Sequence, residues 1–407
     1  MIRRSPAGSH RRMAAPEPRP VAGITTVYRK RSHADVILGK ILEGFAHDGK
    51  EKPGLRLVSL FVDQFPNGDM SRDLASKHGF KLCNSIPEAL TLGGEKLAVD
   101  GVLVVGEHGE YPDNEKGQKL YPRRKFFEEV AKTFRKTGKS VPVLMDKHLS
   151  ATWDDAKWVY DTANELFSPL LAGSTIPLAW RRPKLTLPKG CELTAAVQLG
   201  YGAFEAYGFH ALEGLQCMTE RRKGGETGVA AVTTLRGPAM WEAMAAGRFS
   251  QDLLEEAIRR APAHAKGDYK ELSAKAKDAG IMLVEYRDGL TAAVAMLNGF
   301  LHEGDGGAFC FAGRIKAEEQ PRSTQFYLQQ PEPFAHFGYL VRAFDWMVRN
   351  GHAPYPAART LLTTGILDAA MTSRHQGGKR IETPHLAIRY TPTDWPFADD
   401  PIPGSKK

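Results

Sequence analysis

The sequence predicts an α/β protein of two domains: an N-terminal Rossmann-like, doubly wound parallel sheet, then a C-terminal α+β domain with a largely antiparallel sheet. Two observations predict this class. Up to residue 176, short apolar runs alternate with helix-like segments, which is typical of parallel strands joined by right-handed crossovers. Beyond it the strand-like runs lengthen, and two of them are joined by Asp288-Gly289, a strong hairpin signal. The length of 407 residues also favours two domains.

The first domain is expected to span 21–176. Its strands are runs of apolar and β-branched residues, and the run at 99–105 is apolar almost throughout, as in a parallel strand covered on both faces. Between the strands, apolar residues recur every three or four positions and give each helix one apolar face. The strands are expected at 21–27, 55–62, 80–83, 99–105, 141–145 and 170–174, and the helices at 34–45, 70–78, 86–90, 127–134 and 153–163.

The second domain is expected to span 177–395, after a linker marked by Pro177, Pro183 and Pro188. Its helices are expected to pack on one face of the sheet. A disordered basic leader (1–20) and a tail (396–407) flank the two domains. The strands are expected at 193–199, 228–234, 281–287 and 290–297, and the helices at 238–246, 251–260, 337–349 and 357–374.

Composition excludes several classes of function. About half of the net charge of +8 comes from the leader, and no basic stripe interleaved with aromatic residues follows it, so we expect no nucleic-acid partner. No apolar run reaches the ~20 residues needed to cross a bilayer, so we expect no membrane partner. The four cysteines are far apart and form no C-x-x-C pair, which is typical of reduced thiols in a cytoplasmic protein.

The polar residues that follow the expected strands predict a site. Asp146, Lys147 and His148 follow the strand at 141–145, and Glu107 and His108 follow the strand at 99–105. In an open α/β sheet, ligands bind outside the carboxyl ends of the strands. We therefore expect these side chains to meet in one crevice.

The segment after the first strand, TTVYRKRSH, contains no glycine. Glycines at this point of a dinucleotide-binding fold let the backbone approach the pyrophosphate. Here the chain offers Tyr28, Arg29 and Arg31, and arginine supplies bidentate phosphate contacts. Two interpretations stay open: side chains that bind a cofactor phosphate, or a solvated basic loop on a site that has lost its nucleotide. We expect His33 to be a polar residue of the first helical turn.

The order of elements and four motifs resemble the glucose–fructose oxidoreductase/inositol dehydrogenase (Gfo/Idh/MocA) family over 21–386. The motifs are FVD at 61–63 with the later SKHGFKLCNSIPEAL, DKH at 146–148 where the family has Glu-Lys-Pro, GFHALE at 208–213 like the family's G-x-H-x-x-D, and PYPAARTLLTTGILDAAMTSRHQGGKRIETP near the end. The chain departs from the family in its glycine-less loop. It also has Ala206, with Glu205 one position off, where the family usually has an aspartate.

The resemblance implies an NAD(P)-dependent oxidoreductase that removes a hydride from a secondary hydroxyl of a sugar, polyol or related carbohydrate. It implies catalytic roles for His210, as acid–base group, and for Lys147, as substrate and cofactor contact. Asp63 would accept hydrogen bonds from the ribose hydroxyls, which favours NAD over NADP. A homodimer or homotetramer formed through the outer sheet face is also implied. The expected cofactor contacts are Tyr28, Arg29, Arg31, Asp63, Glu107 and Lys147, and the expected substrate contacts are His108, His148 and Glu205.

Two other interpretations stay open. The same carboxylates and imidazoles suit acid–base steps in a carbohydrate lyase, epimerase or hydrolase. Such donors also ligate Zn²⁺, Mn²⁺ or Fe²⁺, but no H-x-H or H-E-x-x-H spacing supports a metal and none is assigned. Loss of the glycine loop and of the aspartate would also mark a catalytically inactive relative that serves as a binding or structural subunit.

Overall fold

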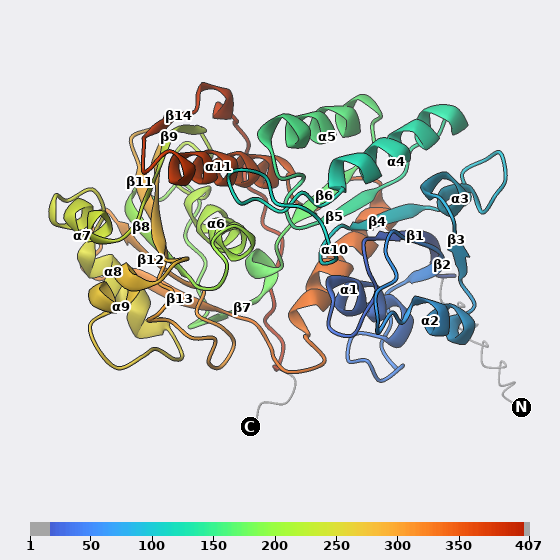
Figure 1. Ribbon diagram of the computed structural model, residues 1–407, viewed down its shortest axis with the longest axis horizontal. Coiled ribbons are helices and arrows are strands. Elements are labelled where there is room, and N and C mark those ends of the chain that lie inside the picture. The colour runs from blue at the N-terminus through green and yellow to red at the C-terminus, as the bar shows by residue number, and fades with distance from the viewer. Residues whose placement is uncertain (1–16, 403–407) are drawn as a thin grey trace, which may run out of the picture.

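The computed structural model describes residues 17–402, and each half of the molecule contains one sheet (Figure 1). Six parallel strands run in the order β3-β2-β1-β4-β5-β6, and eight strands of the second sheet run in the order β14-β9-β10-β11-β8-β12-β13-β7. Both predicted sheet types are confirmed. Most of the predicted leader lies outside the described residues, and its last two residues, Arg19 and Pro20, already belong to β1.

The doubly wound parallel sheet forms as the alternating pattern predicts. Its strand order reverses between β1 and β4, so the loops that follow these two strands flank a crevice at the carboxyl edge of the sheet. The strands are β1 (Arg19–Thr25), β2 (Leu55–Val62), β3 (Lys81–Cys83), β4 (Gly101–Val105), β5 (Val143–Asp146) and β6 (Leu170–Gly173). The helices between them are α1 (His33–Glu43), α2 (Ser71–His78), α3 (Ile86–Thr91), α4 (Arg123–Thr137) and α5 (Trp153–Glu165).

Helix α10 (His336–Asn350) packs on this first sheet, although it comes late in the chain. Leu340 and Phe344 share a buried core with Val21, Ile37 and Leu103. The expectation that this helix packs on the second sheet was therefore wrong. Its apolar stripe predicted a helix that packs on a sheet, but an apolar stripe does not say which of two sheets it covers.

The second sheet is mixed, because β8 and β11 pair in parallel while its other neighbours are antiparallel. The predicted hairpin is confirmed: β10 and β11 pair in antiparallel register around a turn in which Gly289 has φ +93°. The strands are β7 (Trp180–Arg182), β8 (Leu193–Gly200), β9 (Val229–Leu235), β10 (Gly280–Tyr286), β11 (Thr291–Met296), β12 (Cys310–Ile315), β13 (Arg322–Tyr327) and β14 (Ile381–Glu382). The helices are α6 (Ala206–Thr219), α7 (Pro238–Ala245), α8 (Gln251–Arg260), α9 (Tyr269–Lys275) and α11 (Ala358–His375).

Helices cover both faces of the second sheet, so the prediction that they pack on one face was wrong (Figure 1). Met282 and Val284 of β10 face α6 and α11, whereas Ile281 and Leu283 face α7 and α8. The physical reason is visible in β10 and β11, which are apolar on both sides of the pleat, as doubly covered strands are. The outer face, through which we expected an oligomer to form, is thus covered by α7–α9.

The predicted tail packs on the body as far as it is described. Trp180 Nε1 donates to the carbonyl of Asp400 (2.8 Å), and the amide of Ala398 donates to Leu178 (2.9 Å). Among the helices of residues 17–402, none combines the length and apolarity needed to cross a membrane.

Candidate active site

A cavity of about 210 Å³ opens where the carboxyl ends of the parallel strands meet helix α6. Residues from both halves of the molecule line it. Its walls combine imidazoles with aromatic rings. Among the residues that line it are His33, His108, His210, Tyr207, Phe309 and Phe337.

His210 enters the cavity from α6, the helix that the sequence predicted to carry the acid–base residue. Its Nδ1 shares a hydrogen bond of 2.6 Å with the hydroxyl of Ser174, which follows β6. A hydroxyl can donate or accept, so Ser174 suits the ring in both of its protonation states. Burial, and then the positive charge of Lys147, lower the pKa of His210 well below its ordinary value. The ring is therefore neutral at neutral pH and ready to accept a proton.

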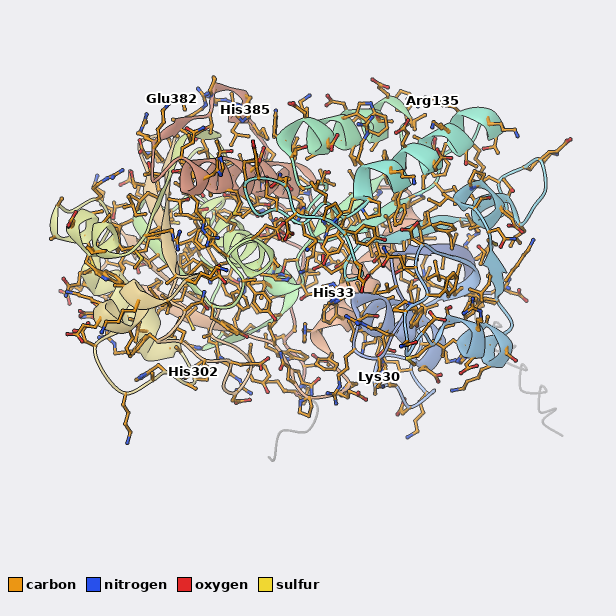
Figure 2. The ribbon with its side chains drawn as sticks, viewed as in Figure 1. Lys30, His33, Arg135, His302, Glu382 and His385 are labelled. Atoms are coloured by element: carbon orange, nitrogen blue, oxygen red, sulfur yellow. The ribbon has the colours of Figure 1, made fainter. Side chains whose placement is uncertain are left out.

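His33, the first residue of α1, lines the same cavity from the other half of the molecule (Figure 2). Its Nδ1 lies 2.6 Å from Oδ2 of Asp146, a carboxylate at the end of β5 that is 2% exposed. An ionised carboxylate only accepts, so Nδ1 carries a proton, and Nε2 is the ring nitrogen left to exchange a proton with a ligand. Sequence reasoning missed this pair, because it gave His33 no role beyond the first helical turn.

Lys147 and Glu107 form a buried ion pair near the cavity. Nζ of Lys147 donates to Oε1 of Glu107 (2.8 Å), and Arg123 of α4 donates to the other oxygen. Burial alone would raise the pKa of Glu107, but the charges of Lys147 and Arg123 outweigh it and hold this pKa well below its usual range. Lys147 does not line the cavity. Its ammonium is turned toward Glu107, near enough to act on the pKa of His210.

The backbone is strained at three of these positions. Arg31, His108 and Lys147 have left-handed φ values of +63°, +68° and +64°. Such a conformation costs on the order of 1–3 kcal/mol for a residue with a side chain, and it clusters at functional sites where the surrounding structure enforces it. His108 also lines the cavity, and burial lowers its pKa to about 4, with a further contribution from His33.

The other two predicted substrate contacts bind each other instead of lining the cavity. His148 is buried, with Nε2 3.2 Å from the carboxylate of Glu205 and 3.4 Å from Arg123. Its Nδ1 lies 2.7 Å from the carbonyl of Ser150. Because Glu205 immediately precedes α6, this pair fastens the start of that helix to the end of β5.

The chain's own contacts cover part of the groove at the ends of β1 and β2, although Asp63 itself stays exposed. Asp63, the predicted ribose contact, accepts a hydrogen bond from the hydroxyl of Tyr111 (2.6 Å). Gln64 accepts from the amide of Glu110 (2.9 Å), and a Cβ on Gly109 would lie 3.2 Å from Val27. The segment after β4 thus packs on the loops after β1 and β2, where this kind of fold places an adenosine ribose.

Contacts within the chain also lie at the phosphate end of that groove. The hydroxyl of Ser32 accepts from the amide of Asp35, and the Asp35 carboxylate accepts from the amide of Arg31 (2.8 Å). The Asp35 carboxylate therefore binds a backbone amide of the loop before α1, next to the helix N-terminus that would attract a phosphate.

The three predicted phosphate contacts do not converge on a ligand. Tyr28 is fully buried in the core and Arg29 is exposed. Arg31 lies at the edge of the cavity, and its exposed side chain pairs with Glu332 (3.4 Å). These residues therefore do not fit a dinucleotide bound as this kind of fold usually binds it.

Sequence reasoning also missed Ser174 and Arg123. Ser174 carried a usable signal, since it follows a strand end like the residues that were chosen.

Within 17–402, no group of three or more His, Cys, Asp or Glu side chains is arranged to hold a metal ion. The four cysteines are free thiols.

No family model matches the sequence, and neither does any curated protein. Solved structures do match. GenD2 from gentamicin A biosynthesis, in complex with NAD, is 16% identical with a TM-score of 0.55 over 93% of this chain and 99% of that chain. An apo scyllo-inositol dehydrogenase from Lactobacillus casei is 11% identical with a TM-score of 0.55 over 90% and 98%. A myo-inositol dehydrogenase from the same organism, in complex with NAD(H) and myo-inositol, is 10% identical with a TM-score of 0.54 over 89% and 96%.

These similarities and the sheet topology define the class: a Rossmann-like domain followed by a mixed-sheet domain, with a crevice between them. More particularly, the chain has the two-domain fold of these structures, at sequence identities of 10–16%. The predicted resemblance is confirmed at the level of the fold.

Proposed function

We propose that this protein is an enzyme that acts on a hydroxyl-bearing carbon of a sugar, polyol or related carbohydrate, with His210 as its acid–base residue. One observation carries the proposal: a neutral imidazole, held by Ser174, faces a cavity between the two halves of the fold. The names of the similar structures, two of which are inositol dehydrogenases, support a carbohydrate as the substrate class.

The cavity suits such a substrate. The rings of Tyr207 and Phe309 stack at 16° with centroids 6.2 Å apart, and they offer apolar surface to the C–H face of a sugar. The imidazoles of His33, His108 and His210 supply polar groups for its hydroxyls. A mostly apolar lining with a few converging polar groups is typical of small-molecule sites.

Two residues have distinct roles in this proposal. His210 takes the proton of the substrate, since its neutral ring is within the cavity. Lys147 acts by its charge: it is fixed by Glu107 behind the cavity and stabilises negative charge that develops on a substrate oxygen. Neither role needs a group that comes from outside the chain.

Oxidation of the hydroxyl is a second candidate, favoured by the likeness to structures whose titles name NAD or NAD(H). A bound nicotinamide would supply the hydride acceptor. The contacts of Asp63 with Tyr111 and of Asp35 with Arg31 do not fit that cofactor, so no step is derived through it. NAD or NADP stays a prediction, as do the homo-oligomer and the cytoplasmic location.

Turnover by the purified protein tests the proposal. D-glucose, D-fructose, D-glucuronate and myo-inositol are incubated with the protein, with and without NAD(P)⁺, and followed by NMR. His210→Asn should lower turnover by about 10²–10⁴-fold, the usual contribution of a general acid–base group. His264→Asn, at an exposed histidine on the surface of the second domain, is the control. Wild-type turnover by His210→Asn would refute the proposal.

A further inference from the structure

We propose that His33 and Asp146 form a second acid–base unit, and that this unit and His210 exchange a proton at one substrate carbon next to a carbonyl group. The inference rests on the proposed function, because it needs His210 to act on a ligand in the cavity. It adds a catalytic residue and a reaction class: epimerisation through an enolate.

The geometry of the pair is that of an oriented base. The Asp146 carboxylate is buried and lies 2.6 Å from Nδ1 of His33, which fixes the tautomer of the ring. The rings of His108 and Phe337 stand edge-on to it with centroids 5.3 Å away and hold its plane. Among residues 17–402, none hydrogen-bonds Nε2 of His33, while the side chain lines the cavity.

A structural role does not account for this pair. The first turn of α1 is already capped without His33, because Ser32 accepts from the amide of Asp35 and Asp35 accepts from the amide of Arg31. The strained backbone of Lys147 directly follows Asp146 and delivers its carboxylate to the crevice. The pair thus stands at the edge of the sheet where ligands bind in this kind of fold.

His33 and His210 come from opposite halves of the molecule, α1 and α6, and line one cavity. A substrate between them meets one imidazole from each domain. Two bases on different sides of a carbon are what inversion of its configuration requires, since the proton leaves on one side and returns on the other.

The step balances without a co-reactant. His210 removes the proton of the C–H bond, and the electron pair of that bond moves into the neighbouring carbonyl, which gives an enolate. Protonated His33 then delivers a proton to the same carbon, and the enolate electrons form the new C–H bond. The charge of Lys147 stabilises the enolate. Exchange with solvent restores both rings, and no oxidant or reductant is consumed.

Hydrogen–deuterium exchange tests this inference. The protein is incubated in D₂O with two epimer pairs, D-glucose with D-mannose and D-fructose with D-allulose, and exchange of the C–H next to the carbonyl is followed by NMR. The wild type should exchange that proton in both epimers of one pair. His210→Asn should lose exchange in one epimer by at least about 100-fold and keep it in the other. His33→Asn should lose exchange in the other epimer and keep it in the first. Asp146→Asn should slow exchange in the same epimer that His33→Asn affects.

Each outcome of this experiment either supports the inference or overturns it. Exchange of both epimers by His33→Asn, at the wild-type rate, overturns the inference but leaves the role of His210 intact. Equal loss of both epimers in His33→Asn also overturns it, because that marks a structural role; His33→Gln replaces this variant if the asparagine form does not fold. If the wild type exchanges the proton in neither pair, the inference is overturned. The proposed function still stands in that case if turnover in the NMR assay depends on His210. His264→Asn should leave all rates unchanged.

Discussion

Glu107 is a buried anion that binds both Lys147 and Arg123, and its replacement by glutamine tests the electrostatics of the crevice. The three side chains are 7%, 5% and 1% exposed. Glutamine keeps the shape of the side chain but leaves two buried cations without a counter-charge. Removing one partner of a buried ion pair costs about 3–5 kcal/mol of unfolding free energy. We expect a value near the lower end, about 3 kcal/mol, because the amide oxygen of glutamine still accepts one hydrogen bond.

Urea denaturation followed by circular dichroism measures this change. The matched control is Asp161→Asn, which breaks an exposed pair with Lys157 one helical turn away and should cost only about 0.3–0.5 kcal/mol. A loss below about 1 kcal/mol in Glu107→Gln would refute the argument. It would mean that the two cations are hydrated and that the crevice carries no concentrated positive charge.

The stability difference between Glu107→Gln and the wild type should also depend on pH. The pKa of Glu107 in the folded protein is well below its ordinary value, because the charges of Lys147 and Arg123 outweigh burial. A depressed folded pKa gives stability that is fully present above the unfolded pKa of about 4.3 and is lost as the pH falls through the folded pKa. The stability gap between wild type and Glu107→Gln should therefore be constant near neutral pH and shrink below about pH 4. A gap that grows on acidification would contradict this sign.

Two further predictions test single contacts. Ser174→Ala removes the 2.6 Å hydrogen bond to His210 and should lower kcat about fivefold, the worth of a hydrogen bond of roughly 1 kcal/mol, with KM little changed and an altered pH profile; an unchanged profile would contradict a positioning role. Gly101→Ala would place a Cβ 2.8 Å from Val348 and 2.9 Å from Phe344 of α10, and this overpacking should cost about 1–3 kcal/mol in thermal or urea unfolding. Gly94→Ala, with its nearest neighbour at 3.4 Å, is the control, and equal effects in both would argue against α10 on the first sheet.

The sequence predicted the first domain well because its elements are local. Each parallel strand is a short apolar run, and each helix shows its own periodic face, so order and type follow without knowledge of distant contacts. The predictions that failed concern contacts between residues that are far apart in the sequence. Helix α10 packs near Val21, more than 300 residues away in the chain, and no local pattern encodes that choice.

The candidate site shows the same division. The strand-end rule located Glu107, His108, Asp146 and Lys147 at one crevice, and the helix motif located His210. The rule does not say which side chains bind each other. Glu107 therefore emerged as a partner of Lys147, and His148 as a partner of Glu205. His33 was missed, because only its approach to Asp146 distinguishes it from an ordinary first-turn residue.

The contacts of Asp63 with Tyr111 and of Asp35 with Arg31 stand where this fold carries a dinucleotide, so we expect the protein to bind none. Calorimetric titration of the wild-type protein with NAD⁺, NADH, NADP⁺ and NADPH tests it directly. We expect no saturable heat with any of the four up to about 1 mM, which corresponds to a binding free energy weaker than roughly −4 kcal/mol. Saturable binding of any one of them at micromolar concentration would contradict it.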